Sequence, residues 1–259
     1  MFLNYKNINI HYTDSGKGTA LVFLHGFLEN STIWKPFISI LSKTNRVVCI
    51  DLLGHGQTEC IGYIHTMEDM AEAVFAVLRH LKLRKYVLLG HSMGGYVALA
   101  LAEKHPDNLK GLCLINSTSR ADSEERKQNR ERAIKAVKEN PKIYTAISIA
   151  NLFAENNREK FKKEIEELKA EALKMSVQGI IAALEGMKRR PDREGLLHFS
   201  PYKKMLILGE KDPVLNYQEN VEQVKNTDVK LVEFPDGHMS FIENESVFLL
   251  KIMHFIENL

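Results

Sequence analysis

One serine has the setting that best suits chemistry, because it lies at the centre of the pentapeptide Gly90-x-Ser92-x-Gly94. The apolar run 86–89 before it is typical of a strand, and the alanine- and leucine-rich run after it is typical of a helix. A strand that turns directly into a helix strains the apical residue and requires small residues on either side. The pattern therefore predicts a hydroxyl displayed at a helix N-terminus, where developing negative charge is stabilised.

A serine hydroxyl is a weak nucleophile at neutral pH and needs a base nearby, usually a histidine that a carboxylate orients. Two later stretches offer these groups, since Asp212 follows the strand-like run 205–209 and His238 follows the run 229–234. The carboxyl ends of parallel strands meet at one edge of a sheet. Ser92, Asp212 and His238 are therefore expected to lie together.

The elements that must position these groups alternate along the chain. Continuous apolar runs are typical of strands buried on both faces, and helical patterns separate them. Such runs occur at 20–24, 46–50, 86–89, 112–115 and 205–209, with further strands expected at 229–234 and, as a pair, within 2–13. Strands that alternate with helices predict an α/β fold with a mostly parallel, eight-stranded sheet flanked by helices.

The alternation stops within residues 117–199, where no strand-like run occurs. This segment has the pattern of three or four amphipathic helices, at about 122–139, 141–154, 157–175 and 176–188. Its charge runs, such as Glu124-Glu125-Arg126-Lys127, are interpreted as a solvated face. We therefore predict a core formed by 1–116 and 200–259, and a helical cap at 117–199 inserted on the sheet.

Composition limits the partners. The 259 residues are 44% hydrophobic and 26% charged, as in an ordinary soluble protein, and the net charge of +2 gives no reason to expect nucleic acid or an anionic membrane. The three cysteines are odd in number and lack metal-ligand spacing, so we expect no metal and a reduced, cytoplasmic setting. No signal peptide is expected, and no apolar run is long enough to span a bilayer.

Five motifs, each at the end of a strand-like run, make the chain resemble the α/β-hydrolase superfamily, in particular its capped, serine esterase-like branch. In chain order they are His25-Gly26-Phe27, Asp51-x-x-Gly54-His55-Gly56, Gly90-His91-Ser92-Met93-Gly94-Gly95, Gly209-x-x-Asp212-Pro213 and Gly237-His238. The resemblance covers the two core segments, whereas the inserted segment resembles the branch only in being a cap.

The resemblance implies a role for each of these residues. Ser92 would be the nucleophile, His238 the general base and then the general acid, and Asp212 the carboxylate that orients the histidine. The backbone N–H groups of Phe27 and Met93 would form the oxyanion hole, in which one donor is typically worth about 3 kcal/mol. The side chains of Phe27, Met93 and Met239 are expected to line the substrate pocket; Met187 is a further candidate that no motif places near the site. No cofactor is expected.

Other residues remain alternatives for these roles. Glu210 could replace Asp212 as the orienting acid, whereas Asp236 is interpreted as a turn residue. Some members of the superfamily carry the acid after the preceding strand, where this chain has Asn116, and this favours Asp212. His25 and His91 are interpreted as structural residues rather than as catalytic ones.

The nucleophile indicates the reaction. Relatives that open epoxides or remove halides carry aspartate at the apex of the turn, and the serine argues against both activities. The resemblance implies a hydrolase that cleaves a carboxylic ester or thioester of a small molecule through an acyl-enzyme. A carbon–carbon bond hydrolase or lyase, and a small-molecule receptor with slow or no turnover, are the alternatives. The oligomeric state is not predicted.

Overall fold

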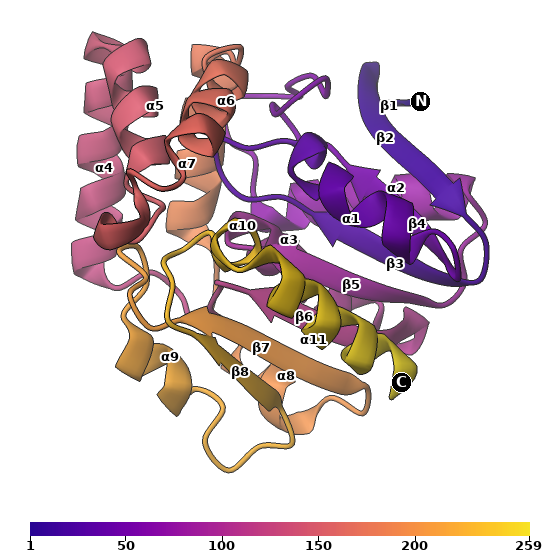
Figure 1. The fold of residues 1–259 in the computed structure, drawn as a ribbon. Helices are drawn as coiled ribbons and strands as arrows, with labels where there is room; N and C mark the ends of the chain where they lie inside the picture. Colours follow the sequence, from indigo (N-terminus) through magenta and orange to yellow (C-terminus); the bar gives the residue numbers. More distant parts are fainter.

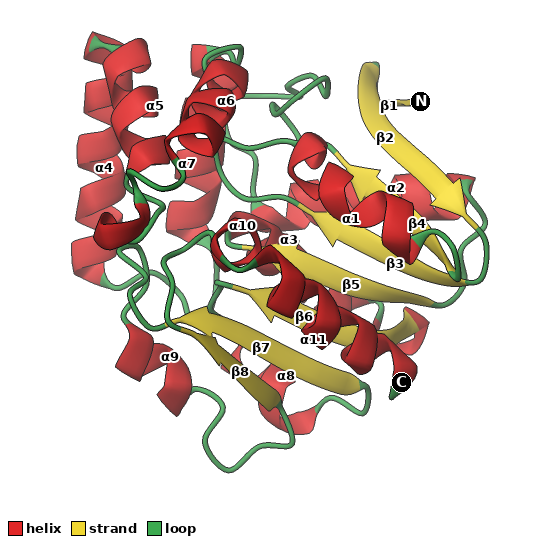
Figure 2. Cartoon of the chain, viewed as in Figure 1, coloured by secondary structure: helices red, strands yellow, loops and turns green.

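The computed structural model describes all 259 residues, and an eight-stranded sheet forms its centre (Figures 1 and 2). The strand order is β1-β2-β4-β3-β5-β6-β7-β8. Strands β1 and β2 are antiparallel to their neighbours, and the other six strands, including β3, are parallel to one another. The strands are β1 (Phe2–Tyr5), β2 (Ile8–Gly16), β3 (Thr19–Leu24), β4 (Asn45–Ile50), β5 (Tyr86–His91), β6 (Leu109–Ile115), β7 (Lys203–Gly209) and β8 (Lys230–Phe234). The predicted α/β fold with a mostly parallel sheet is confirmed.

Helices cover both faces of this sheet and form a separate group beside it (Figure 1). The α-helices are α1 (Lys35–Leu41), α2 (Met67–His80), α3 (Met93–Lys104), α4 (Glu124–Glu139), α5 (Pro141–Ala150), α6 (Lys162–Ala172), α7 (Val177–Arg189), α8 (Glu194–Phe199), α9 (Tyr217–Glu222), α10 (Ser240–Glu243) and α11 (Glu245–Glu257). Three short 3-10 turns are η1 (Ser31–Trp34), η2 (Pro106–Asn108) and η3 (Glu155–Asn157).

Successive side chains of each strand point to opposite faces, and this produces two cores. In β3, Val22 and Leu24 join the core that α2 and α3 complete, whereas Leu21 and Phe23 join the core that α1 and α11 complete. A strand buried on both faces must be apolar at every position, which explains the unbroken hydrophobic runs in the sequence. The two cores hold the carboxyl ends of the parallel strands at one edge.

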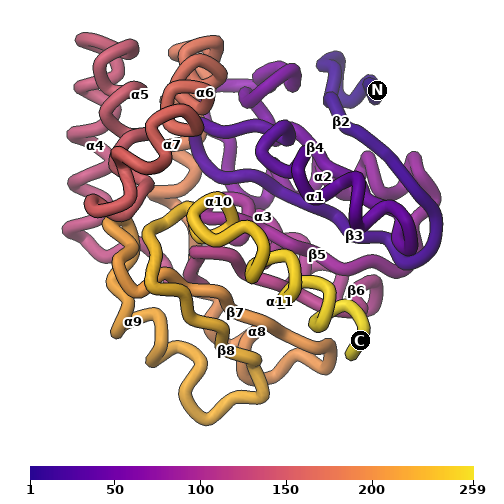
Figure 3. The backbone as a smooth tube through the Cα atoms, in the orientation of Figure 1, coloured from indigo at the N-terminus to yellow at the C-terminus, as the bar shows by residue number.

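Helices α4–α7 stand at that edge, toward which the parallel strands point (Figure 1). In the backbone trace the chain leaves the sheet after β6, forms these helices and returns to β7 (Figure 3). Beyond α7, Arg193 forms ion pairs with Glu68 of α2 and Glu103 of α3. The end of the predicted insertion, 117–199, therefore contacts the core helices.

Helix α7 packs closely against the core. A Cβ atom on Gly186 would overlap the carbonyl oxygen of His65, and one on Gly179 would overlap that of Gly54. The backbone N–H of His65 also donates to the carbonyl of Ala182, 3.0 Å away, from outside the helix. Because these contacts are between backbones, α7 forms a fixed wall above the strand ends.

The closing helix α11 packs on the sheet through residues that match the expected set only in part. The sequence pattern predicts a helix at about 244–258 that buries Val247, Leu250, Met253 and Phe255 or their near neighbours, but Val247 and Leu250 are 40% and 63% exposed. Phe248 and Ile252 are buried with Phe255 instead. The helix has apolar residues on more than one face, so its periodicity alone does not decide which side packs on the sheet.

Candidate active site

Ser92 occupies the turn between β5 and α3 in a strained conformation, with φ of 49° and ψ of −115°. The elements around it pack so closely that a Cβ on Gly90 would overlap the carbonyl oxygen of Gly94, and a Cβ on Gly94 would lie 2.5 Å from that of Leu24. The Ser92 backbone N–H donates to the carbonyl of Ile115 over 2.9 Å and anchors the turn to β6. These contacts hold the strained turn and present the hydroxyl at the strand ends.

The three predicted side chains lie within hydrogen-bond distance of one another. His238 Nε2 is 2.8 Å from Ser92 Oγ, and His238 Nδ1 is 2.7 Å from Asp212 Oδ2. A carboxylate can only accept, so Nδ1 carries the proton and donates to Asp212. The Nε2 lone pair is then free to accept the proton of the Ser92 hydroxyl. The three groups come from the loops after β5, β7 and β8.

Asp212 is held as a carboxylate by its surroundings. Burial alone would raise the pKa of Asp212, but His238 and the backbone N–H groups of Leu215 and Val214 lower it. These N–H groups donate to Oδ1 over 2.9 and 2.8 Å. Asn116 Nδ2 donates to Oδ2 over 3.2 Å and also to the Gly237 carbonyl over 3.1 Å. Asn116 therefore braces both Asp212 and the loop that carries His238, a role that sequence reasoning missed.

The alternative acids do not reach His238. Glu210 is exposed at the end of β7, and Asp236 is buried with one carboxylate oxygen near the Asn157 amide. The adjacent Glu243 accepts from the backbone N–H of Gly237 over 2.9 Å. The His238 backbone N–H donates over 2.8 Å to the carbonyl of Leu152, which follows α5. The histidine loop is thus fixed to the cap.

Two backbone N–H groups are available near Ser92. Phe27, in the loop after β3, lines the same cavity as Ser92 and His238, and Met93 is the first residue of α3. Neither N–H donates to an acceptor within the protein. His25 holds the Phe27 loop, because its Nδ1–H donates to Gly26 O over 2.8 Å while Nε2 accepts from the Leu52 N–H over 2.9 Å. Burial lowers the pKa of His25 and keeps it neutral, as this bonding requires.

A buried ion pair lies behind the turn. Glu29 Oε2 is 3.0 Å from His91 Nδ1 and accepts from the Gly26 N–H over 2.6 Å. His91 Nε2 is 3.0 Å from the backbone carbonyl of His238. Both partners of the His91 ring are acceptors, so both ring nitrogens must donate and the ring is an imidazolium. Burial alone would lower the pKa of His91, but Glu29 and the His238 carbonyl raise it.

The pKa of Glu29 is shifted in the opposite direction to that of His91. Burial alone would raise the pKa of Glu29, but the charge of His91 and the hydrogen bonds from His91 and Gly26 lower it. The pair connects the Phe27 loop to the His238 loop through the residue next to Ser92. His91 is therefore a positioning residue for both loops rather than a second base, in agreement with its structural interpretation.

A cavity of about 370 Å³ opens above Ser92. Its floor carries Ser92 and His238, and its apolar walls come from both core and cap. The polar cap residues on the wall belong to α4 and α5 and the turn that follows: Arg126, Asn129, Arg130, Tyr144, Ser148 and Asn151. Of the predicted solvated charge run, only Glu124 and Glu125 are exposed, whereas Arg126 faces the cavity.

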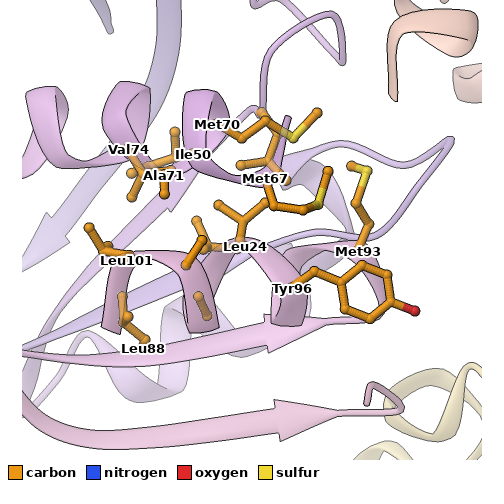
Figure 4. Close-up of a cluster of buried hydrophobic side chains, with 14 of the residues drawn as sticks. Leu24, Ile50, Met67, Met70, Ala71, Val74, Leu88, Met93, Tyr96 and Leu101 are labelled. Atoms are coloured by element: carbon orange, nitrogen blue, oxygen red, sulfur yellow. The ribbon is translucent and has the colours of Figure 1, made fainter. Parts of the chain in front are cut away.

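The prediction that the Met93 and Met239 side chains line the pocket is wrong. Met93 is fully buried in the core between α2 and α3, in the same cluster as Met67 and Tyr96 (Figure 4). Met239 is fully buried in the other core, on the opposite face of the sheet. A motif indicates where the backbone of a residue lies, but the packing of the surrounding elements determines the direction of its side chain. The methionine that lines the cavity is Met187 of α7.

No cluster of three or more histidine, cysteine, aspartate or glutamate side chains is arranged to hold a metal ion. None of the helices has the length and apolar character that a membrane-spanning segment requires.

Comparison with known proteins identifies the class. A family model described as alpha/beta hydrolase fold matches residues 19–245, which include every residue of the site described above. The chain therefore belongs to the α/β-hydrolase fold family, as the five motifs predict.

Several individual proteins are similar to this chain. An esterase from Thermogutta terrifontis, solved with malate bound, is 30% identical with a TM-score of 0.92 and covers 100% of this chain and 98% of its own. An enol-lactonase from Burkholderia xenovorans LB400 has a TM-score of 0.91 over 99% of this chain and 100% of its own, but its 22% identity shows only a common fold.

Curated relatives match a shorter stretch. The uncharacterized hydrolase YugF of Bacillus subtilis (strain 168) is 34% identical over 109 residues, which are 42% of this chain and 40% of that protein. The (E)-2-((N-methylformamido)methylene)succinate hydrolase of Acinetobacter baylyi (strain ATCC 33305 / BD413 / ADP1) is 30% identical over 110 residues, 42% of each protein. The chain thus spans about two fifths of the length of these curated relatives.

Proposed function

We propose that this protein is a serine hydrolase that cleaves a carboxylic ester or thioester of a small molecule through an acyl-enzyme. The observation that carries the proposal is the chain of hydrogen bonds from Asp212 through His238 to Ser92 at the floor of the cavity. The free backbone N–H groups of Phe27 and Met93 support it, because acyl transfer needs donors for an oxyanion. The similar esterase from Thermogutta terrifontis is consistent with it.

The first half of the reaction acylates the serine. His238 Nε2 accepts the hydroxyl proton as Ser92 Oγ attacks the carbonyl carbon, and Asp212 stabilises the imidazolium that forms. The carbonyl oxygen becomes an oxyanion that the Phe27 and Met93 N–H groups bind. The tetrahedral intermediate then collapses, the bond to the alcohol or thiol breaks, and His238 gives its proton to the leaving group.

The second half releases the acid. A water molecule replaces the leaving group, His238 Nε2 takes its proton, and the hydroxide attacks the acyl carbon of the ester on Ser92. The second tetrahedral intermediate breaks the bond to Ser92 Oγ, which regains the proton from His238. The products are a carboxylic acid and the unmodified enzyme, and no step needs a cofactor. The three free cysteines support a cytoplasmic setting for this reaction.

A chain-length series of p-nitrophenyl esters tests the proposal on wild type and the Ser92→Ala variant. We expect turnover of the short esters by wild type and a loss of about 10⁴-fold or more in the variant. Turnover that persists in Ser92→Ala would overturn the role of Ser92. An absence of turnover across the series, despite labelling by a fluorophosphonate, would favour a receptor or a carbon–carbon bond hydrolase or lyase on the same fold.

A further inference from the structure

Three arginines share one carboxylate at the base of the cap. The Asp122 side chain is fully buried; Arg126 Nε and Arg190 Nη1 lie 3.2 and 2.8 Å from its Oδ1, and Arg130 Nε contacts its Oδ2. Burial alone would raise the pKa of Asp122, but the three guanidinium groups lower it and keep it ionised. None of the three arginines has another acidic partner. The cluster therefore has a surplus of two positive charges.

Two of these arginines face the cavity above Ser92. Arg126 and Arg130 are four residues apart on α4, so they lie on one face of the helix. Both line the cavity, with side chains 34% and 14% exposed. Arg190 is not among the residues that line the cavity, and its guanidinium lies 4.0 Å from the centre of the Tyr96 ring. The surplus charge is thus presented to whatever occupies the cavity.

Each of the two cavity arginines keeps an unused hydrogen-bonding group. Arg126 uses Nε toward Asp122 and Nη1 toward the Val214 carbonyl, and its Nη2 has no partner in the protein. Arg130 uses Nε and Nη2 toward Asp122, and its Nη1 has no partner. Asp122 fixes both guanidinium planes, so little side-chain entropy is lost when an anion binds. Planar donors held in this way suit a carboxylate.

The rest of the cavity does not neutralise this charge. The only carboxylate among the residues that line the cavity is Glu29, whose charge is matched by His91. Tyr144 and Ser148 of α5 add hydroxyl groups to the wall near α4. The remaining walls are largely apolar, with Leu152 and Leu184 among them. An occupant with a neutral reacting group, an apolar spacer and an anionic end would match these surfaces.

We propose that Arg126 and Arg130 form a carboxylate-binding subsite, and that the substrate is an ester which itself carries a carboxylate, such as a half-ester of a dicarboxylic acid. The inference rests on the proposed function, because the ester carbonyl must reach Ser92 while the carboxylate contacts α4. In this proposal the cap helps to determine substrate specificity in addition to covering the site. The carboxylate can be part of the acyl group or of the leaving alcohol, and the test has one arm for each.

The test compares esters of nearly equal shape that differ in charge. Ethyl hydrogen glutarate is compared with its amide, ethyl glutaramate, and carboxypropyl acetate with the corresponding amide, by titration of the acid released. We expect kcat/KM of wild type to favour the carboxylate in at least one pair by about tenfold or more, as a charge-assisted hydrogen bond provides. Arg126→Gln and Arg130→Gln should each remove most of this preference. Arg189→Gln is the matched control, because Arg189 is exposed and pairs with Glu185 of its own helix.

A second measurement separates the subsite from catalysis. Glutarate should bind the Ser92→Ala variant in calorimetry, glutaramide should not, and adding Arg126→Gln or Arg130→Gln should weaken glutarate binding by about tenfold or more. Thermal unfolding of each variant identifies any that fails to fold. Equal kcat/KM for charged and neutral esters with no glutarate binding would overturn the subsite and leave the hydrolase intact. Glutarate binding without turnover of any ester would support the subsite and overturn the hydrolase.

Discussion

Replacing Glu29 by glutamine removes the negative half of an ion pair that is fully buried behind Ser92. The amide keeps the shape of the carboxylate and can still accept from the Gly26 N–H, so the change tests charge rather than packing. His91 then loses the carboxylate that raises its pKa, and it must give up a proton or remain an unpaired buried charge. Breaking a buried pair by removing one partner typically costs about 3 kcal/mol. For a chain of this size, that corresponds to a fall in Tm of about 6–12 °C.

The pH dependence follows from the two pKa shifts. The pKa of His91 is raised above its ordinary 6.5, so the stability from its charged form is complete below 6.5 and lost as pH rises through the raised value. The pKa of Glu29 is lowered below its ordinary 4.5, so its contribution is complete above 4.5 and lost as pH falls through the lowered value. The pair therefore stabilises the protein in full between about pH 4.5 and 6.5.

Thermal unfolding of wild type and Glu29→Gln across pH tests this reasoning. We expect the difference in Tm to be largest near pH 5.5 and to shrink at alkaline pH, where His91 loses its proton in both proteins. Esterase activity should fall as well, because the pair holds the loops of Phe27 and His238. Glu124→Gln is the control, since Glu124 is exposed and pairs only with Lys127. A Tm difference that is small, or that does not vary with pH, would refute the assignment of a buried imidazolium.

Two further pairs of variants test the site and the cap. Asp212→Asn should lower kcat by about 10⁴-fold because it disturbs the tautomer and charge of the triad, whereas Glu210→Gln should have little effect on the same ester assay; the reverse result would move the acid to Glu210. Gly186→Ala should lower Tm and activity together, because the added methyl would overlap the His65 carbonyl and displace α7. Gly195→Ala, in α8 with open space around it, should be neutral or stabilising by up to about 1 kcal/mol in thermal unfolding, and a similar Tm loss in both variants would contradict the close backbone contact.

The parts of the site that lie at strand ends were predictable from the sequence. Strands buried on both faces leave continuous apolar runs, and the parallel arrangement sends their carboxyl ends to one edge. Ser92, Asp212 and His238 are predictable because each lies a few residues after an expected strand, and their side chains lie within hydrogen-bond distance of one another. The proline after Asp212 favours it over Glu210, and the amide at Asn116 argues against an acid after the preceding strand.

The directions of side chains next to the motifs were not predictable in the same way. Met93 and Met239 adjoin the catalytic positions in sequence, yet each points into a hydrophobic core. Arg126 belongs to a charge run that is typical of a solvated helix face, and only the packing of α4 against α5 and α7 turns it toward the cavity. Asp122 precedes α4, and its position four residues before Arg126 and eight before Arg130 was the available signal, because those two arginines lie on one helix face.

The most direct test of the account is to trap the acyl group. Wild-type protein is mixed with p-nitrophenyl butyrate, quenched in acid before the first turnover is complete, digested and analysed by mass spectrometry. We expect a butyryl group on Ser92 that is absent from the Ser92→Ala protein, with its formation slowed by several orders of magnitude in His238→Ala. Turnover of the ester without acylation of Ser92, or a butyryl group on another residue that is formed and released at the rate of turnover, would contradict it.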